Sequence, residues 1–215
     1  ANQHPIVRKI LIEVASQQNA TIKWVVPLGK EWELGLPGYI QRENAAVAKG
    51  ALEALATLGW HIAPQSIKEG FALTKWPGRL QKVFWEGNPL LIDCAHNPNA
   101  AKQLSNERQH WEENVSGIHW VLGIQRKKDA PAIIGHLVQE NDWAWIVEIP
   151  GHDSWGRNDL SKACPNLDRQ LIQAKTVQEA LTNIRATSKW PKPTPVIAGS
   201  LYLIGYLFSK NLIQV

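Results

Sequence analysis

Leu-Leu-Ile-Asp-Cys-Ala-His-Asn-Pro, residues 90–98, sets the architecture expected for this chain. Its first three residues form the uninterrupted apolar run of a strand that is buried on both faces of a sheet. Asp93 ends the run, and Asn97 followed by proline is the pattern with which a helix begins. Asp93 and His96 are therefore expected in a strand-to-helix turn at the carboxyl end of the strand, where open α/β sheets bind ligands.

Strand and helix patterns alternate from residue 76 to the end of the chain. The predicted strands are 82–85 and 89–93 (a hairpin), 119–124, 143–149, 172–175 and 195–198, and the predicted helices are 98–111, 130–139, 159–164, 177–187 and 201–210. Repeated β-α units with short connections imply a mainly parallel sheet covered by helices on both faces. The expected fold class is therefore α/β, with a Rossmann-like domain at 76–215.

The first 75 residues follow another pattern. Apolar spacing predicts helices at 6–16, 41–58 and 64–73, and the segment 22–27 has the composition of a strand. One strand does not close a sheet by itself. This region is therefore interpreted as the end of a domain whose beginning is missing.

The composition narrows the function classes. An apolar fraction of 44% and a charged fraction of 20% are those of a soluble globular protein. The formal charge is only +4, and basic residues are dispersed apart from 126–128, which argues against a nucleic-acid partner. No apolar run is long enough to cross a bilayer, so no membrane association is expected. Two cysteines are too few for a disulfide framework, which favours the cytoplasm. The absence of methionine, even at position 1, suggests a piece of a longer protein.

Four motifs carry a resemblance to a known family. They are Leu-Pro-Gly-Tyr-Ile-Gln-Arg-Glu-Asn-Ala-Ala-Val-Ala (36–48), Trp-Pro-Gly-Arg-Leu-Gln (76–81), Leu-Ile-Asp-x-Ala-His-Asn-Pro-x-Ala-Ala (91–101) and Ala-Gly-Ser-Leu-Tyr-Leu-Ile-Gly (198–205). In this order they resemble the carboxyl-terminal part of the folylpolyglutamate synthase / dihydrofolate synthase family, within the Mur ligase superfamily of ATP-dependent amide-bond-forming ligases. Two positions depart from the family pattern. Cys94 stands where glycine is usual, and Lys127 stands where the first acid of an Asp-Lys-Asp motif is expected.

The resemblance implies roles for five residues. Asn44 would contact the adenine of ATP, and Arg79 would contact ATP from the linker between two domains. Asp93 would also contact ATP. His96, implied to lie by the nucleotide phosphates and the incoming glutamate, would be catalytic, and Ser200 would help to bind glutamate.

Each of these residues also has a purely structural interpretation. Asp93 and Ser200 are ordinary helix-capping types, and Asn44 suits the first turn of its helix. Arg79 could be a surface arginine beside a Pro-Gly turn, and His96 a packed or solvated histidine. Asn97 is better explained as an N-cap than as a ligand contact.

The sequence lacks the phosphate-binding Gly-x-x-x-x-Gly-Lys-Ser/Thr loop that ATP chemistry of this type needs. The resemblance places that loop and the Mg²⁺ ligands upstream, so none of the residues here is expected to bind a metal. We therefore expect residues 1–75 to be the end of a central ATP-binding domain and 76–215 to be a complete Mur ligase carboxyl-terminal domain. The missing amino-terminal part would be its main partner, and the fragment alone would be inactive.

The parent enzyme implied by the resemblance adds L-glutamate to the γ-carboxylate of a reduced folate, through an acyl phosphate formed from ATP. Dihydropteroate is a further substrate in bifunctional members of the family. Two alternatives stay open: a self-contained nucleotide-binding or interaction module, and another Mur-type amino-acid ligase.

Overall fold

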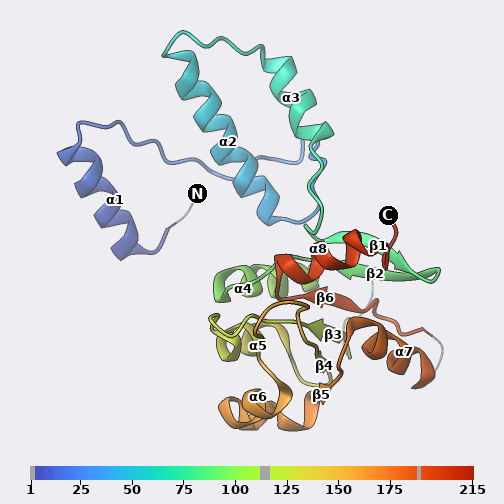
Figure 1. Ribbon diagram of the computed structural model, residues 1–215. Coiled ribbons are helices and arrows are strands. Elements are labelled where there is room, and N and C mark those ends of the chain that lie inside the picture. Colours follow the sequence, from blue (N-terminus) through green and yellow to red (C-terminus); the bar gives the residue numbers. More distant parts are fainter. Residues whose placement is uncertain (1–2, 112–116, 188–189) are drawn as a thin grey trace. The chain divides into compact units, whose positions relative to one another are not determined.

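The computed structural model describes residues 3–111, 117–187 and 190–215, and the chain forms two compact units, Ala1–Trp76 and Pro77–Val215 (Figure 1).

The first unit contains the helices α1 (Pro5–Gln17), α2 (Ile40–Ala56) and α3 (Pro64–Leu73). Proline at the first position of α1 and of α3 fixes where these two helices begin. The three helices confirm the predicted ones within one or two residues at each end. The predicted strand 22–27 is wrong: no strand occurs among the described residues of this unit. An extended segment becomes a strand only beside a hydrogen-bonding neighbour, and Val26 is 80% exposed in a segment without one.

The second unit is an α/β domain. Its strands are β1 (Gln81–Trp85), β2 (Asn88–Ile92), β3 (His119–Leu122), β4 (Trp143–Ile146), β5 (Leu171–Gln173) and β6 (Val196–Ala198). Its α-helices are α4 (Pro98–Glu107), α5 (Ala130–Leu137), α6 (Arg157–Ala163), α7 (Val177–Thr187) and α8 (Leu201–Ser209), with 3₁₀ helices at Arg108–His110 and Pro165–Gln170. The sheet order is β1-β2-β6-β3-β4-β5, and every pairing is parallel except the β1–β2 hairpin. The predicted Rossmann-like class is confirmed.

Several predicted boundaries were too long. The helix expected at 98–111 ends at Glu107 and continues as a 3₁₀ turn, and the strands of the sheet core are three to five residues long. The 3₁₀ helix at Pro165–Gln170 was not predicted. In β2, Leu90 and Ile92 are fully buried whereas Leu91 is only half-buried, so the strand is not covered equally on its two faces.

The sheet has a hydrophobic cluster on each face. One cluster packs Trp120 and Leu122 of β3 against α4, α5 and α6, and the other packs Val121 of the same strand with residues of α7 and α8. This alternation follows from the two-residue period of a strand. Figure 1 shows α4, α5 and α6 along one side of the sheet and α7 on the other.

The connections explain where ligands can enter. The crossovers through α4, α5 and α6 lie on one face and lead from β2 to β3, then to β4 and β5. The crossover through α7 runs on the other face and returns β6 to a place between β2 and β3. A crevice opens at the carboxyl ends of two neighbouring strands when the chain leaves one strand toward one face of the sheet and leaves the other strand toward the opposite face. Two such crevices arise, one at β6 and one between β4 and β5.

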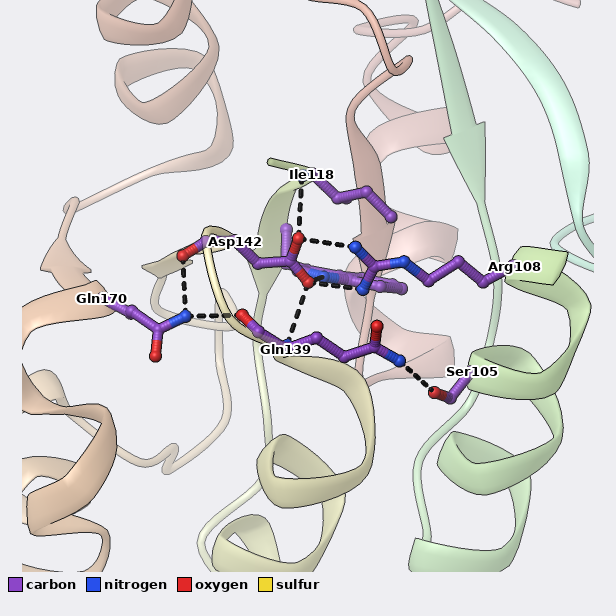
Figure 2. A network of polar contacts seen from close by, with 7 residues as sticks. Ser105, Arg108, Ile118, Gln139, Asp142 and Gln170 are labelled. Atoms are coloured by element: carbon purple, nitrogen blue, oxygen red, sulfur yellow. Dashed lines mark hydrogen bonds and ion pairs between the residues drawn. The ribbon is translucent and has the colours of Figure 1, made fainter. Parts of the chain in front are cut away.

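A buried ion pair joins the elements at the opposite, amino-terminal edge of the sheet. The Asp142 carboxylate accepts hydrogen bonds from both terminal nitrogens of Arg108, at 2.6 and 2.8 Å. It also accepts from the backbone N–H groups of Ile118 and Gln139 and from the indole of Trp120. Figure 2 shows this network, in which one carboxylate just before β4 ties together β3 and the segments that follow α4 and α5.

Candidate functional site

The carboxyl ends of β2 and β6 lie side by side and carry three of the predicted site residues. The two strands pair in parallel, and the Asp93 N–H donates to the carbonyl of Ile197 at 3.0 Å. Asp93 and His96 follow β2, and Ser200 follows β6. The turn after β2 leads to α4 on one face, and the turn after β6 leads to α8 on the other. These residues therefore stand at a topological switch point of the sheet.

Both carboxylate oxygens of Asp93 accept backbone hydrogen bonds. Oδ2 accepts from Leu80 N at 2.9 Å, and Oδ1 accepts from Ala95 N at 2.8 Å. Burial raises the pKa of Asp93, and the two N–H donors and the nearby charge of Arg79 oppose that rise. The side chain is half-buried, and each oxygen keeps a further lone pair with which it could accept from a ligand. Asp93 thus links the strand end to the segment that carries Arg79.

Arg79 is exposed and lies in a tightly held turn. Gly78 on one side has a φ of 74°, and Leu80 on the other has a φ of 41°. The carbonyl of Gly78 accepts from Cys94 N, and a Cβ on Gly78 would lie 2.5 Å from the Cys94 sulfur. Only glycine fits at this position, because the backbone is left-handed and the neighbour is too close for a side chain. The turn presents the guanidinium to solvent from a fixed backbone.

The Cys94 thiol is buried beneath this turn. Burial, together with the charge of Asp93, raises the pKa of Cys94 to about 11, so the thiol is protonated at neutral pH. A protonated thiol is a poor metal ligand. In the part of the chain that the structure describes, no group of three or more His, Cys, Asp and Glu side chains could hold a metal ion.

The orientation of His96 is set by one hydrogen bond. Its Nδ1 lies 2.9 Å from the carbonyl oxygen of Cys94. Since a carbonyl only accepts, Nδ1 carries the proton and Nε2 is left as the free acceptor of the neutral ring. Asn97, the next residue, accepts from Ala100 N and caps α4, which confirms its predicted N-cap role.

Ser200 caps α8 from a buried position. Its hydroxyl oxygen accepts from the N–H groups of Tyr202 (3.1 Å) and Leu203 (3.4 Å), and the residue is 2% exposed. Gly199 before it has a φ of 103°, and a Cβ there would lie 2.6 Å from the carbonyl of Gly123. The structure therefore shows the capping role directly. The hydroxyl proton is not used by the cap and remains available as a donor.

Asn44 lies in the other unit and lines a separate small cavity. This cavity measures about 210 Å³ and is bounded mainly by Leu34, Leu36, Ala45, Ala48 and Phe71, with Gln41, Asn44 and Thr74 as its polar groups. The Asn44 amide donates to Gln41 Oε1 at 3.0 Å, which leaves its carbonyl and one N–H for a ligand. Because α2 begins at Ile40, Asn44 stands in the second turn of the helix rather than in the first.

A second cavity escaped the sequence analysis. It measures about 660 Å³ and lies at the carboxyl ends of β4 and β5, bounded by residues 148–156 and by Gln173, Lys175 and Glu179. The polar run His-Asp-Ser at 152–154, which lines this cavity, was not singled out as a candidate site from the sequence. Pro-Gly before that run, at 150–151, was the available signal for a shaped turn.

The mainly parallel sheet, with Asp93, His96 and Ser200 at one switch point, defines a Rossmann-like α/β domain. The chain belongs to the family described as "Dihydrofolate synthetase, C-terminal domain", whose model matches residues 79–210. Folylpolyglutamate synthase of Lacticaseibacillus casei is 29% identical over 176 residues, which are 80% of this chain and 38% of that protein. Dihydrofolate synthase/folylpolyglutamate synthase of Escherichia coli K12 is 31% identical over 168 residues, which are 78% and 37% of the two chains. The chain therefore spans little more than a third of the length of these relatives.

Solved structures share the fold. Mycobacterium tuberculosis folylpolyglutamate synthase complexed with ADP superposes with a TM-score of 0.77 at 20% identity, over 97% of this chain and 53% of that one. The E. coli FolC complex with ADP, without folate substrate, gives a TM-score of 0.73 at 20% identity, over 94% and 50%. No helix in the described ranges is both long and apolar enough to span a membrane.

Proposed function

We propose that this chain is the carboxyl-terminal part of an ATP-dependent ligase that joins L-glutamate to the γ-carboxylate of a folate. In this proposal residues 1–75 complete an ATP-binding domain, and residues 76–215 are the domain that receives glutamate. The observation that carries it is the family match over residues 79–210, together with Asp93, His96 and Ser200 at one switch point of that domain.

The chemistry proceeds in two displacements. The γ-carboxylate oxygen of the folate attacks the γ-phosphorus of ATP, which forms an acyl phosphate and releases ADP. The amine of glutamate, after losing a proton, attacks the acyl carbon, so that the amide bond forms and inorganic phosphate leaves. Positioning and charge stabilisation dominate the catalysis of the first step.

The candidate site residues of this chain are chemically suited to bind particular groups of ATP and glutamate. The Asn44 amide, in its small and mostly apolar cavity, is matched to a nucleobase edge, which both donates and accepts. The exposed guanidinium of Arg79 suits a phosphate. His96 offers Nε2 to accept a proton, or a donor once protonated, beside negative charge that develops on the acyl phosphate. The Ser200 hydroxyl and the start of α8 suit a carboxylate of glutamate.

The described residues of this chain do not fit a Mg²⁺ site, because no cluster of three potential ligands occurs among them. The sequence also lacks a phosphate-binding loop of the Gly-x-x-x-x-Gly-Lys-Ser/Thr type. We propose that both belong to a preceding part of the protein, since the relatives are more than twice as long as this chain.

A labelled-glutamate assay tests the proposal. The complete protein encoded by the gene should incorporate radiolabelled L-glutamate in an ATP-dependent manner into a folate acceptor, with ADP and phosphate formed in equal amounts. Dihydropteroate as a second acceptor tests whether the enzyme is bifunctional. The present chain alone should show no incorporation above background. No incorporation by the complete protein would contradict the ligase, whereas turnover by this chain alone would contradict its being only a part.

A further inference from the structure

The cavity of about 660 Å³ at β4 and β5 lies outside the site described above. Its position has a topological cause, because the segment after β4 leads to α6 on one face and the segment after β5 leads to α7 on the other. It is therefore the second crevice of the sheet, at the strand ends where such folds bind ligands. Its size is within the range of about 300–1,000 Å³ that is typical of small-molecule sites.

The loop that forms one wall is held in place. The indole N–H of Trp155 donates to the carbonyls of Arg126 and Lys128, at 3.0 and 3.1 Å. The ring of His152 packs on Tyr202 at a centroid distance of 4.2 Å. These contacts anchor both the beginning and the end of the segment 152–155. The cavity is thus a feature of the folded domain rather than a space that opens only on binding.

The starts of the two helices beside this cavity offer little to a phosphate or another anion, because the chain's own side chains already bind N–H groups there. At the start of α7, the Lys175 N–H donates to the Glu179 carboxylate, and the Glu179 N–H donates to the Thr176 hydroxyl. At the start of α6, the Arg157 N–H donates to the side-chain carbonyl of Gln173. The chain thereby caps both helices that border the cavity with its own side chains.

The charged groups left over are of mixed sign. The carboxylates of Glu148 and Asp153 and the ammonium of Lys175 line the cavity, and each makes no hydrogen bond or ion pair with any residue that the structure describes. A third carboxylate, that of Glu179, is engaged in the cap but adds to the negative field. A ligand that complements two free carboxylates and one free ammonium carries two ammonium groups and one carboxylate.

We propose that this cavity binds a diamino monocarboxylic acid, that is, a basic amino acid of the lysine class. Glu148 and Asp153 receive its ammonium groups, and Lys175 receives its carboxylate. L-Glutamate has the opposite charge pattern and is repelled, so this site is distinct from the one that the proposed ligase reaction needs. The inference does not depend on the proposed function.

An NMR titration of the ¹⁵N-labelled chain with four ligands tests which charged groups of the ligand are needed for binding. L-Lysine is expected to give saturable shifts at the backbone amides of residues 148, 149, 151–156 and 175. L-Norleucine, which lacks the second amine, and cadaverine, which lacks the carboxylate, are expected to bind more weakly, by up to about fivefold for norleucine. L-Glutamate is expected to give no saturable shift there.

Charge-neutralising variants test the named residues. Glu148→Gln combined with Asp153→Asn should weaken lysine binding about tenfold, and added salt should weaken binding to the wild type. Glu140→Gln, an exposed change of the same kind outside the cavity, should leave the affinity unchanged. The proposal is overturned if lysine gives no saturable shift at the cavity, if norleucine binds as well as lysine, or if glutamate binds better. If the double variant does not fold, the comparison of the four ligands on the wild type still tests the proposal.

Discussion

Replacing Asp142 with asparagine should destabilise the second unit more than any other single polar change that preserves side-chain size. The carboxylate receives five donors, two on Oδ1 (Arg108 and Ile118) and three on Oδ2 (Arg108, Trp120 and Gln139). Asparagine offers one oxygen and one NH₂ group. Whichever way the amide is turned, at least two of the donors face another donor.

The magnitude follows from burial. Asp142 is 1% exposed and Arg108 is 6% exposed, so neither partner is compensated by water. Breaking a buried pair costs about 3–5 kcal/mol, and each buried donor left unsatisfied costs about 1–3 kcal/mol, although such terms do not add fully. A loss of about 3–5 kcal/mol is a large share of the roughly 5–15 kcal/mol that stabilises a domain. If the free energy of unfolding falls by about 3 kcal/mol per molar urea, the urea concentration at the midpoint of unfolding should fall by roughly 1–2 M.

Urea unfolding measures this directly, with far-UV circular dichroism and the NMR signal of the Trp120 indole as probes. Arg108→Met should cost less than Asp142→Asn, because the carboxylate keeps three of its donors. Asp159→Asn is the surface control: it breaks an ion pair with Arg126 whose side chains are both 45% exposed, and should cost under about 1 kcal/mol. The reasoning would be refuted if Asp142→Asn lowered the free energy of unfolding by less than about 1 kcal/mol, or by no more than Asp159→Asn does.

Three further outcomes are expected. Burial lowers the pKa of His119, whose Nδ1 accepts an indole hydrogen bond, so the folded state resists protonation and stability should fall as the pH drops below about 6.5. Thermal unfolding of the wild type and of His119→Gln between pH 7.5 and 5 checks this. Parallel curves of melting temperature against pH for the two proteins would contradict it. Asp93→Asn leaves one of two backbone donors without an acceptor, at about 1–3 kcal/mol, so the amide of Leu80 or that of Ala95 should exchange faster with deuterium while the sheet core does not. Gly78→Ala should cost about 2 kcal/mol or more, through its φ of 74° and its clash with the Cys94 sulfur, and adding Cys94→Gly should restore the part that is due to the clash, which denaturant titration of the pair would reveal.

The sequence predicted the second unit well because its signals are local. Buried strands read as short apolar runs, and the helices α4 and α8 carry their caps, Asn97 and Ser200, directly before them. The strand at 22–27 was predicted from composition alone, whereas a strand depends on a partner that composition does not reveal. The Asp142 network was equally invisible, because its donors come from residues 108, 118, 120 and 139, which are brought together only by the tertiary fold.

The same contrast applies to the two crevices. The one at β6 could be located from sequence because Asp93 and His96 follow an obvious strand and because a resemblance aligned them with Ser200 across about a hundred residues. The one between β4 and β5 could not, because it arises only when α6 and α7 take opposite faces, which no local pattern encodes.

A structural role and a ligand-binding role are compatible at this switch point, and the hydrogen bonds explain why. The oxygens of Asp93 accept from Leu80 and Ala95, and the oxygen of Ser200 accepts from the start of α8, so each side chain is held by backbone N–H groups. These hydrogen bonds use only part of the bonding capacity of each side chain: the Asp93 oxygens keep further lone pairs, and the Ser200 hydroxyl keeps its proton as a donor. Side chains oriented in this way lose little further entropy on binding, which is the property that a site for positioning reactants requires. These backbone contacts are therefore the reason that these residues could serve a ligand, and not an argument against it.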